Sequence, residues 1–120
     1  MTAPKWAQDL ILDVLVKHEY DRIPDMVWRH RSGVHSSGTC YTYRIVLSAG
    51  TDRTDAKLVL LHELAHWLLP MYERHSPRFW RLAWQLYREY RLPIRYTLQR
   101  EASYRKGARA AYANLRRNGS

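Results

Sequence analysis

The sequence predicts an α+β fold, in which a small antiparallel sheet packs on a central helix and further helices lie towards both ends of the chain. Two observations carry this prediction: a stretch of β-branched and aromatic residues in the first half, and apolar residues at helical spacing before and after it. A third observation concerns size. Because 120 residues with 46% hydrophobic side chains suit one core, residues 1–120 are expected to form a single domain.

The first half of the chain is expected to form one helix and then short strands. Apolar residues at helical spacing predict a helix over residues 6–17, and the break around Pro24 is followed by a strand candidate at residues 26–28. Residues 39–48 are rich in β-branched and aromatic side chains, which favours one or two further strands. Gly50 ends this region.

A central helix is expected next, running to about Leu69, and Pro70 ends it. This segment is apolar nearly all round, which is typical of a helix buried in the middle of a domain. Residues with oxygen-bearing side chains precede it and suit the N-cap position. These candidates are Thr51, Asp52 and Thr54.

Two more helices are expected in the last part of the chain. Ser76 as N-cap and Pro77 at the first helical position predict the start of one, which ends at the break of residues 92–93. A last, basic helix is predicted from about residue 97 to residue 115. Residues 116–120 are expected to be disordered.

Residues 62–66 read His-Glu-Leu-Ala-His and predict a metal site on the central helix. Two histidines four positions apart project from the same helix face, so both imidazoles can bind one zinc ion. Glu63 points partly sideways, which allows its carboxylate to act as general base on a metal-bound water. Unpaired histidines in such an apolar helix would each cost about 1–3 kcal/mol of desolvation, which favours a ligand role for His62 and His66.

A catalytic zinc site usually has three protein ligands, so a third one is needed. His75 is the favoured candidate because it lies directly ahead of a helix start, where the chain can turn back towards the same ion. Glu73 is the alternative, since a carboxylate can also serve as third ligand. It lies in a looser loop.

Two segments together resemble the core of the SprT-like zinc metallopeptidases: residues 62–66, and residues 75–80, which read His-Ser-Pro-Arg-Phe-Trp. That family has an HExxH helix followed by a histidine that opens a short His-Gly-x-x-Phe/Trp element. The resemblance covers roughly residues 38–91. It implies a zincin-like fold, one catalytic Zn²⁺, His75 as third ligand, and Phe79 and Trp80 as packing residues behind the site.

The resemblance also implies that residues 44–48 form the substrate-facing edge of the sheet. Two departures from the family pattern are visible: Ser76 stands where a glycine is usual, and the spacer between the second and third histidines is short. The C-terminal zinc ribbon of some members is absent. A chain this short and rich in Arg and Trp would suit a minimal, phage-encoded member.

The expected function is therefore that of a zinc metallopeptidase, a hydrolase that cleaves a protein or peptide substrate, with DNA-associated proteins as one class of target. Two other functions stay open. One is a non-catalytic, zinc-stabilised module that binds DNA or acts as a scaffold. The other is a regulatory peptidase that cleaves a repressor.

The charge distribution is the reason for considering DNA. Residues 1–73 hold 8 Lys/Arg and 9 Asp/Glu, whereas residues 74–120 hold 12 Lys/Arg and 2 Asp/Glu. A basic surplus confined to one part of a chain favours an anionic partner such as nucleic acid. The candidate DNA-binding residues are Arg100, Arg105, Lys106 and Arg109, and the alternative is a solvated helix surface.

The chain shows neither a secretory signal nor an apolar stretch long enough to cross a membrane, so no membrane partner is expected. Cys40 is the only cysteine, which excludes an internal disulfide and a cysteine-rich zinc ribbon. It is interpreted as a half-buried strand residue. The expected location is the cytoplasm, or the host cytoplasm for a phage-encoded protein.

Overall fold

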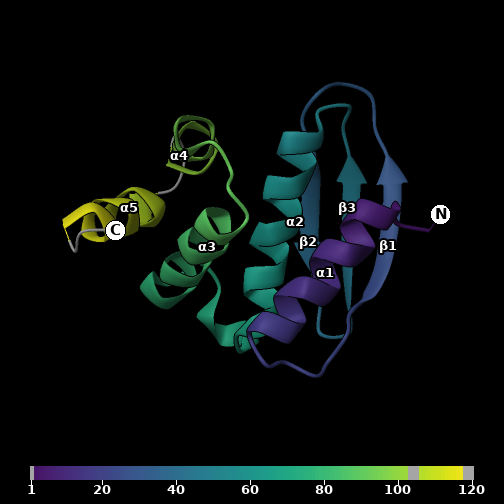
Figure 1. Cartoon of the computed structure of the whole chain (residues 1–120), viewed down its shortest axis with the longest axis horizontal. Coiled ribbons are helices and arrows are strands. Elements are labelled where there is room, and N and C mark those ends of the chain that lie inside the picture. The colour runs from purple at the N-terminus through teal and green to yellow at the C-terminus, as the bar shows by residue number, and fades with distance from the viewer. Residues whose placement is uncertain (1, 103–105, 118–120) are drawn as a thin grey trace.

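The computed structural model describes residues 2–102 and 106–117, which form an α+β fold of five α-helices and a small sheet (Figure 1). The helices lie at both ends of the chain and the strands lie between the first two helices, as predicted. The elements are α1 (Lys5–Lys17), β1 (Asp25–His30), β2 (Ser37–Cys40), β3 (Arg44–Ala49), α2 (Arg53–Leu68), the 3-10 turn η1 (Met71–Glu73), α3 (Pro77–Glu89), α4 (Ile94–Ala102) and α5 (Lys106–Arg117).

The sheet has the strand order β1-β3-β2 and is mixed, so the prediction of an antiparallel sheet is wrong. Strands β2 and β3 form an antiparallel hairpin, but β3 also pairs with β1 in parallel. The reason is that after β1 the chain first forms β2 at the opposite edge of the sheet. It then returns as β3, which lies between the other two strands. Side-chain alternation predicts a strand, but it carries no information about the direction of its neighbour.

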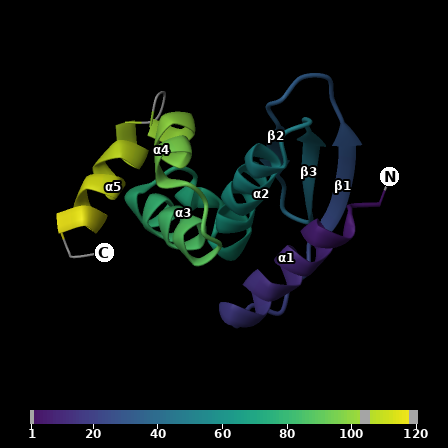
Figure 2. The same ribbon diagram turned by 45° about the horizontal axis from the view of Figure 1, so that its top comes forward.

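One face of the sheet is covered by α1 and α2, which lie side by side on it (Figures 1 and 2). The strand residues that face these helices include Trp28, Ile45 and Leu47, which are at most 3% exposed. The rings of Trp6 on α1 and Trp28 on β1 meet edge to face, with their centroids 5.8 Å apart. The sheet and the two helices thus share one apolar core.

Helix α2 lies between the sheet and α3, which explains why it is apolar nearly all round (Figure 2). Of the three predicted N-caps the structure uses Asp52, whose carboxylate accepts hydrogen bonds from the backbone N–H groups of Thr54 and Asp55. The helix ends at Leu68, just before Pro70. Ser76 caps α3 as predicted, because its Oγ accepts from the Phe79 N–H.

The C-terminal part differs from the prediction. In place of one helix over residues 97–115, the chain forms α4 directly after Pro93 and then the separate helix α5. Apolar spacing continues from one helix into the other and therefore does not reveal the division. Helix α5 extends to Arg117, and residues 118–120 lie outside the described part, so the expected disorder of residues 116–120 stays a prediction.

Helix α5 packs on α3, and α4 packs on α5. The Trp84 indole N–H donates to the backbone oxygen of Ala108, with 3.0 Å between the atoms. No helix in the described part of the chain is long and apolar enough to span a membrane.

Candidate metal centre

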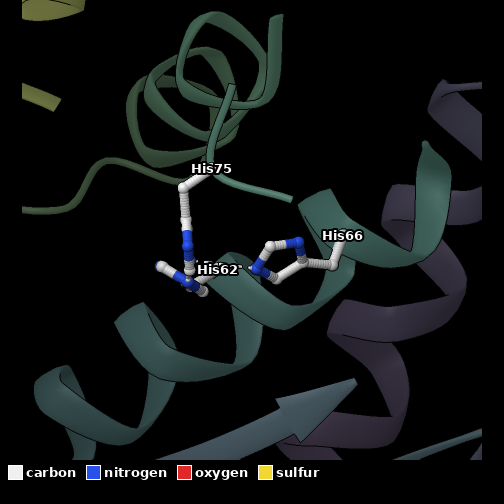
Figure 3. A group of neighbouring side chains, drawn as sticks. All are labelled: His62, His66 and His75. Carbon is white, nitrogen blue, oxygen red and sulfur yellow. Dashed lines mark hydrogen bonds between the residues drawn. The ribbon is translucent and has the colours of Figure 1, made fainter. Parts of the chain in front are cut away.

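Three histidines from two parts of the chain converge on one point (Figure 3). His62 and His66 project from neighbouring turns of α2, and His75 comes from the residue that precedes the N-cap of α3. Before it, Arg74 adopts a positive φ of 45°, a region that non-glycine residues seldom occupy. This turn, followed by the fixed start of α3, directs His75 back towards α2.

The imidazole nitrogens lie at the separations that a shared metal ion requires. His75 Nε2 is 3.1 Å from His62 Nε2 and 3.2 Å from His66 Nε2, and the possible ligand atoms of the three rings all lie within 4.8 Å of one another. Nitrogens bound to one tetrahedral zinc ion at 2.0–2.1 Å are about 3.3 Å apart. His75 Nε2 thus lies near this separation from both other rings, and the three side chains are close enough to bind one metal ion.

Hydrogen bonding among the rings is a poor alternative explanation. A ring nitrogen either donates one proton or accepts through one lone pair, so His75 Nε2 cannot make a well-aligned hydrogen bond to both partners. A metal ion accepts all three lone pairs at once. The geometry thus favours His75 as third ligand, while Glu73 has another contact: its Oε2 accepts a hydrogen bond from Ser76 Oγ, 3.1 Å away.

Glu63 lies on the same turn of α2 but is not one of the three convergent ligands. Its side chain is 6% exposed, and the backbone N–H of Cys40 on β2 donates to its carboxylate. Burial raises the pKa of Glu63, the neighbouring His62 lowers it and Glu101 raises it, with a net shift above the usual value. A buried carboxylate of raised pKa is a suitable proton acceptor.

The cluster lines a cleft of about 780 Å³, which is the volume of an ordinary ligand site. Strand β2 and the residue before it form one wall, and α2, the turn before α3, and Arg100 and Glu101 of α4 form the others. The edge of the sheet that faces the cleft is therefore β2, and the expectation that residues 44–48 form it is wrong, because β3 is the central strand. Cys40 lies half-buried in β2, where burial raises the pKa of its thiol to about 12.

Gly38 allows β2 to approach α2 closely at this point. A Cβ atom at Gly38 would lie 2.9 Å from Glu63 Cγ and 3.1 Å from a methyl group of Val59, both closer than ordinary packing allows. The glycine thus permits the hairpin to hold the Glu63 carboxylate against the cleft wall. Sequence analysis did not single out Gly38.

Phe79 and Trp80 lie behind the histidine cluster, as the resemblance to the SprT-like family implied. Phe79 stacks on His66 with ring centroids 4.1 Å apart, and Trp80 stacks on His75 at 5.5 Å. Both are buried, at 0% and 1% exposure. They restrict the orientation of the imidazoles, so the expectation of a packing role is confirmed.

Sequence analysis missed Glu101, which lies on α4. Its Oε2 is 3.1 Å from Nδ1 of His62, the ring nitrogen that faces away from the cluster, and its side chain is 4% exposed. One signal could have found it: Glu101 is one of two acidic residues after position 73, in a segment otherwise rich in arginine. An isolated acid in such a segment is a candidate for a specific contact.

The four predicted DNA-binding residues do not share one environment. The Arg100 guanidinium binds the buried carboxylate of Asp55, with 2.6 Å between Nε and Oδ1, so it is committed to an internal contact. Lys106 and Arg109 are exposed on α5, and Arg105 lies outside the described residues. Of the three positions that the structure describes, Lys106 and Arg109 thus present exposed cations.

Fold and site together define an α+β protein in which three histidines lie close enough to bind one metal ion. No protein-family model, no curated protein and no solved structure matches the chain. The chemistry of the side chains in the cleft is therefore the basis for assigning a function.

Proposed function

We propose that this protein is a zinc-dependent peptidase of the SprT-like type. The observation that carries the proposal is the convergence of three Nε2 atoms beside a buried glutamate in an open cleft. Structural zinc sites are usually closed by four protein ligands, whereas catalytic sites combine three ligands with one open position. Among the described residues three histidines, and no fourth ligand, form the cluster.

The roles of the residues follow from their positions. His62, His66 and His75 would hold the ion through Nε2. A bound zinc ion supplies a Lewis acid that lowers the pKa of a coordinated water to about 7. Glu63 accepts the proton of the attacking water through its carboxylate, and the Cys40 N–H keeps that carboxylate in place.

A peptide substrate is favoured by the wall that β2 forms. In the described part of the chain β2 pairs with β3 along one edge only, so its other edge faces the cleft, where backbone groups other than the Cys40 N–H can pair with an extended chain. Addition of a strand to an open sheet edge is a recurrent mode of peptide recognition. It would align the scissile carbonyl with the histidine cluster.

The direct test is metal content together with peptidase activity. The purified protein is expected to contain about one zinc ion per chain, measured by elemental mass spectrometry. Activity on unfolded protein substrates is expected to disappear after chelation and to return when zinc is added. A zinc-loaded protein that cleaves no unfolded protein and no peptide in a degenerate library would contradict the proposal.

Replacing Gly38 by alanine is expected to lower kcat/KM by about 10²-fold while zinc stays bound, because a displacement of about 1 Å in a catalytic group costs roughly that factor. The added methyl group would collide with Glu63 Cγ and move either the carboxylate or β2. The two measurements are peptidase kinetics and zinc content of the same preparation.

Ser37→Ala is the matched control, since Ser37 is the preceding, exposed residue of β2 and the change adds no atoms towards α2. It should retain activity near that of the wild type. Equal activity of the Gly38→Ala and Ser37→Ala proteins would show that close approach of β2 to Glu63 is not needed for catalysis.

A further inference from the structure

Helix α4 brings two consecutive side chains to α2, although the two helices are far apart in the sequence. Arg100 binds Asp55 in the first turn of α2, and Glu101 contacts His62 almost two turns further along. The backbones of α4 and α2 have little direct contact, since α4 packs mainly on α5. These polar contacts join α4 to the helix that carries the histidines.

Glu101 is placed to set the orientation of His62. A carboxylate is an acceptor, so at 3.1 Å it favours the tautomer of His62 that carries its proton on Nδ1. The lone pair of Nε2 then points towards the cluster, where His75 Nε2 lies 3.1 Å away. Carboxylates that hold the outer nitrogen of a metal-binding histidine in this way commonly raise metal affinity 10–100-fold.

The neighbouring pair of Arg100 and Asp55 holds α4 in place for this contact. Arg100 Nε and Nη2 lie 2.6 Å and 3.2 Å from the two oxygens of Asp55, an arrangement with two parallel hydrogen bonds. The Tyr96 hydroxyl of α4 donates to the same carboxylate. The Ser36 backbone N–H donates to it from the loop before β2, with 2.5 Å between the atoms.

The ionisation of Asp55 supports this role. Burial alone would raise its pKa, but hydrogen bonds from Arg100, Tyr96 and the Ser36 N–H together hold the pKa below its usual value. The carboxylate is therefore charged at neutral pH and pairs with Arg100. One buried anion thus joins α2, α4 and the loop that leads into the cleft wall.

We propose that Glu101 is a positioning residue of the metal centre and that its contact with His62 makes α4 part of that centre, so that zinc binding and docking of α4 favour each other. The inference rests on the metal ion of the proposed function but not on peptidase activity. Because energetic coupling is reciprocal, whatever factor the docking of α4 adds to zinc affinity, zinc binding adds to the docking of α4.

A second contact extends the same arrangement to α5. A Cβ atom at Gly107 would lie 2.9 Å from the Trp80 ring, so α5 approaches this ring closely at its second residue. Trp80 in turn stacks on His75. The two C-terminal helices thus support two different ligands, His62 through Glu101 and His75 through Trp80.

The test compares zinc affinity of the full chain with that of Glu101→Ala and Glu101→Gln, by competition with a chromophoric chelator. Glu101→Ala is expected to lower zinc affinity about 10–100-fold. Glu101→Gln is expected to lose less, because its amide oxygen can still accept the Nδ1 proton, and it replaces Glu101→Ala if the latter does not fold. The matched control is Glu89→Ala, which removes the other acid of the C-terminal part at a contact with His18, the C-cap residue of α1.

Two further readouts distinguish positioning from general stability. In cobalt-loaded protein, the visible absorption bands of the metal should change in the Glu101 variants and not in Glu89→Ala. Hydrogen exchange of the α4 amides should slow on zinc addition in the wild type, and this slowing should be lost in Glu101→Ala. Unchanged zinc affinity in both Glu101 variants, or α4 exchange that does not respond to zinc, would overturn the proposal.

The experiments can distinguish a failure of this inference from a failure of the proposed peptidase function. A wild-type protein that binds zinc and cleaves nothing would refute the peptidase and leave the role of Glu101 standing. A peptidase whose zinc affinity does not depend on Glu101 would refute the inference alone.

Discussion

Glu63→Gln is expected to abolish peptide cleavage and to leave the bound zinc in place. The amide has nearly the shape of the carboxylate but cannot accept a proton, and loss of a general base typically costs about 10²–10⁴-fold in rate. Zinc should be retained because Glu63 is not one of the three convergent ligands. The check is kcat/KM and zinc content, measured on one preparation.

Glu73→Gln is the control, since it makes the same chemical change at the acid that contacts Ser76 outside the cluster. Its activity should stay close to that of the wild type. If the Glu63→Gln protein carried full zinc and cleaved as fast as the wild type, the proposed mechanism would be refuted.

His75→Ala is expected to cause the largest loss of zinc affinity among variants outside α2. It removes one of three nitrogen ligands. The loss of zinc affinity should therefore exceed the 10–100-fold loss that is typical when a residue that hydrogen-bonds to a ligand is replaced. Glu73→Ala, by contrast, should bind zinc nearly as well as the wild type. Chelator competition on both proteins measures the difference directly.

The comparison is decisive because the two residues lie two positions apart in the same turn. The turn includes the unusual backbone of Arg74, which directs His75 inwards. Greater loss of zinc in Glu73→Ala than in His75→Ala would assign the third ligand to the carboxylate and contradict the site described above.

Much of the site could be predicted because it depends on local geometry. The spacing of His62 and His66 puts both on one helix face wherever that helix lies. His75 is directed by the turn just before it and by the helix start just after it, with Ser76 as N-cap. The helix boundaries at Asp52 and Pro70 are likewise set by the hydrogen-bonding capacity of a few adjacent residues.

Other features depend on contacts between distant parts of the chain. The position of β2 at the cleft edge, with β3 in the centre, follows from how the hairpin pairs with β1. The contact of Glu101 with His62 spans 39 positions, and that of Arg100 with Asp55 spans 45. No periodicity or spacing in the sequence indicates either pair.

The sequence alone therefore determined the side chains of the candidate metal centre: two histidines and a glutamate on one apolar helix, with a third histidine close behind. The tertiary structure decided which strand faces these side chains and which residues contact them. The physical reason is that helix caps and ligand spacing are set by covalent geometry over a few residues. The order of the strands in the sheet, and the contacts of Arg100 and Glu101 on α4 with residues of α2, depend instead on how distant segments pack around a common core.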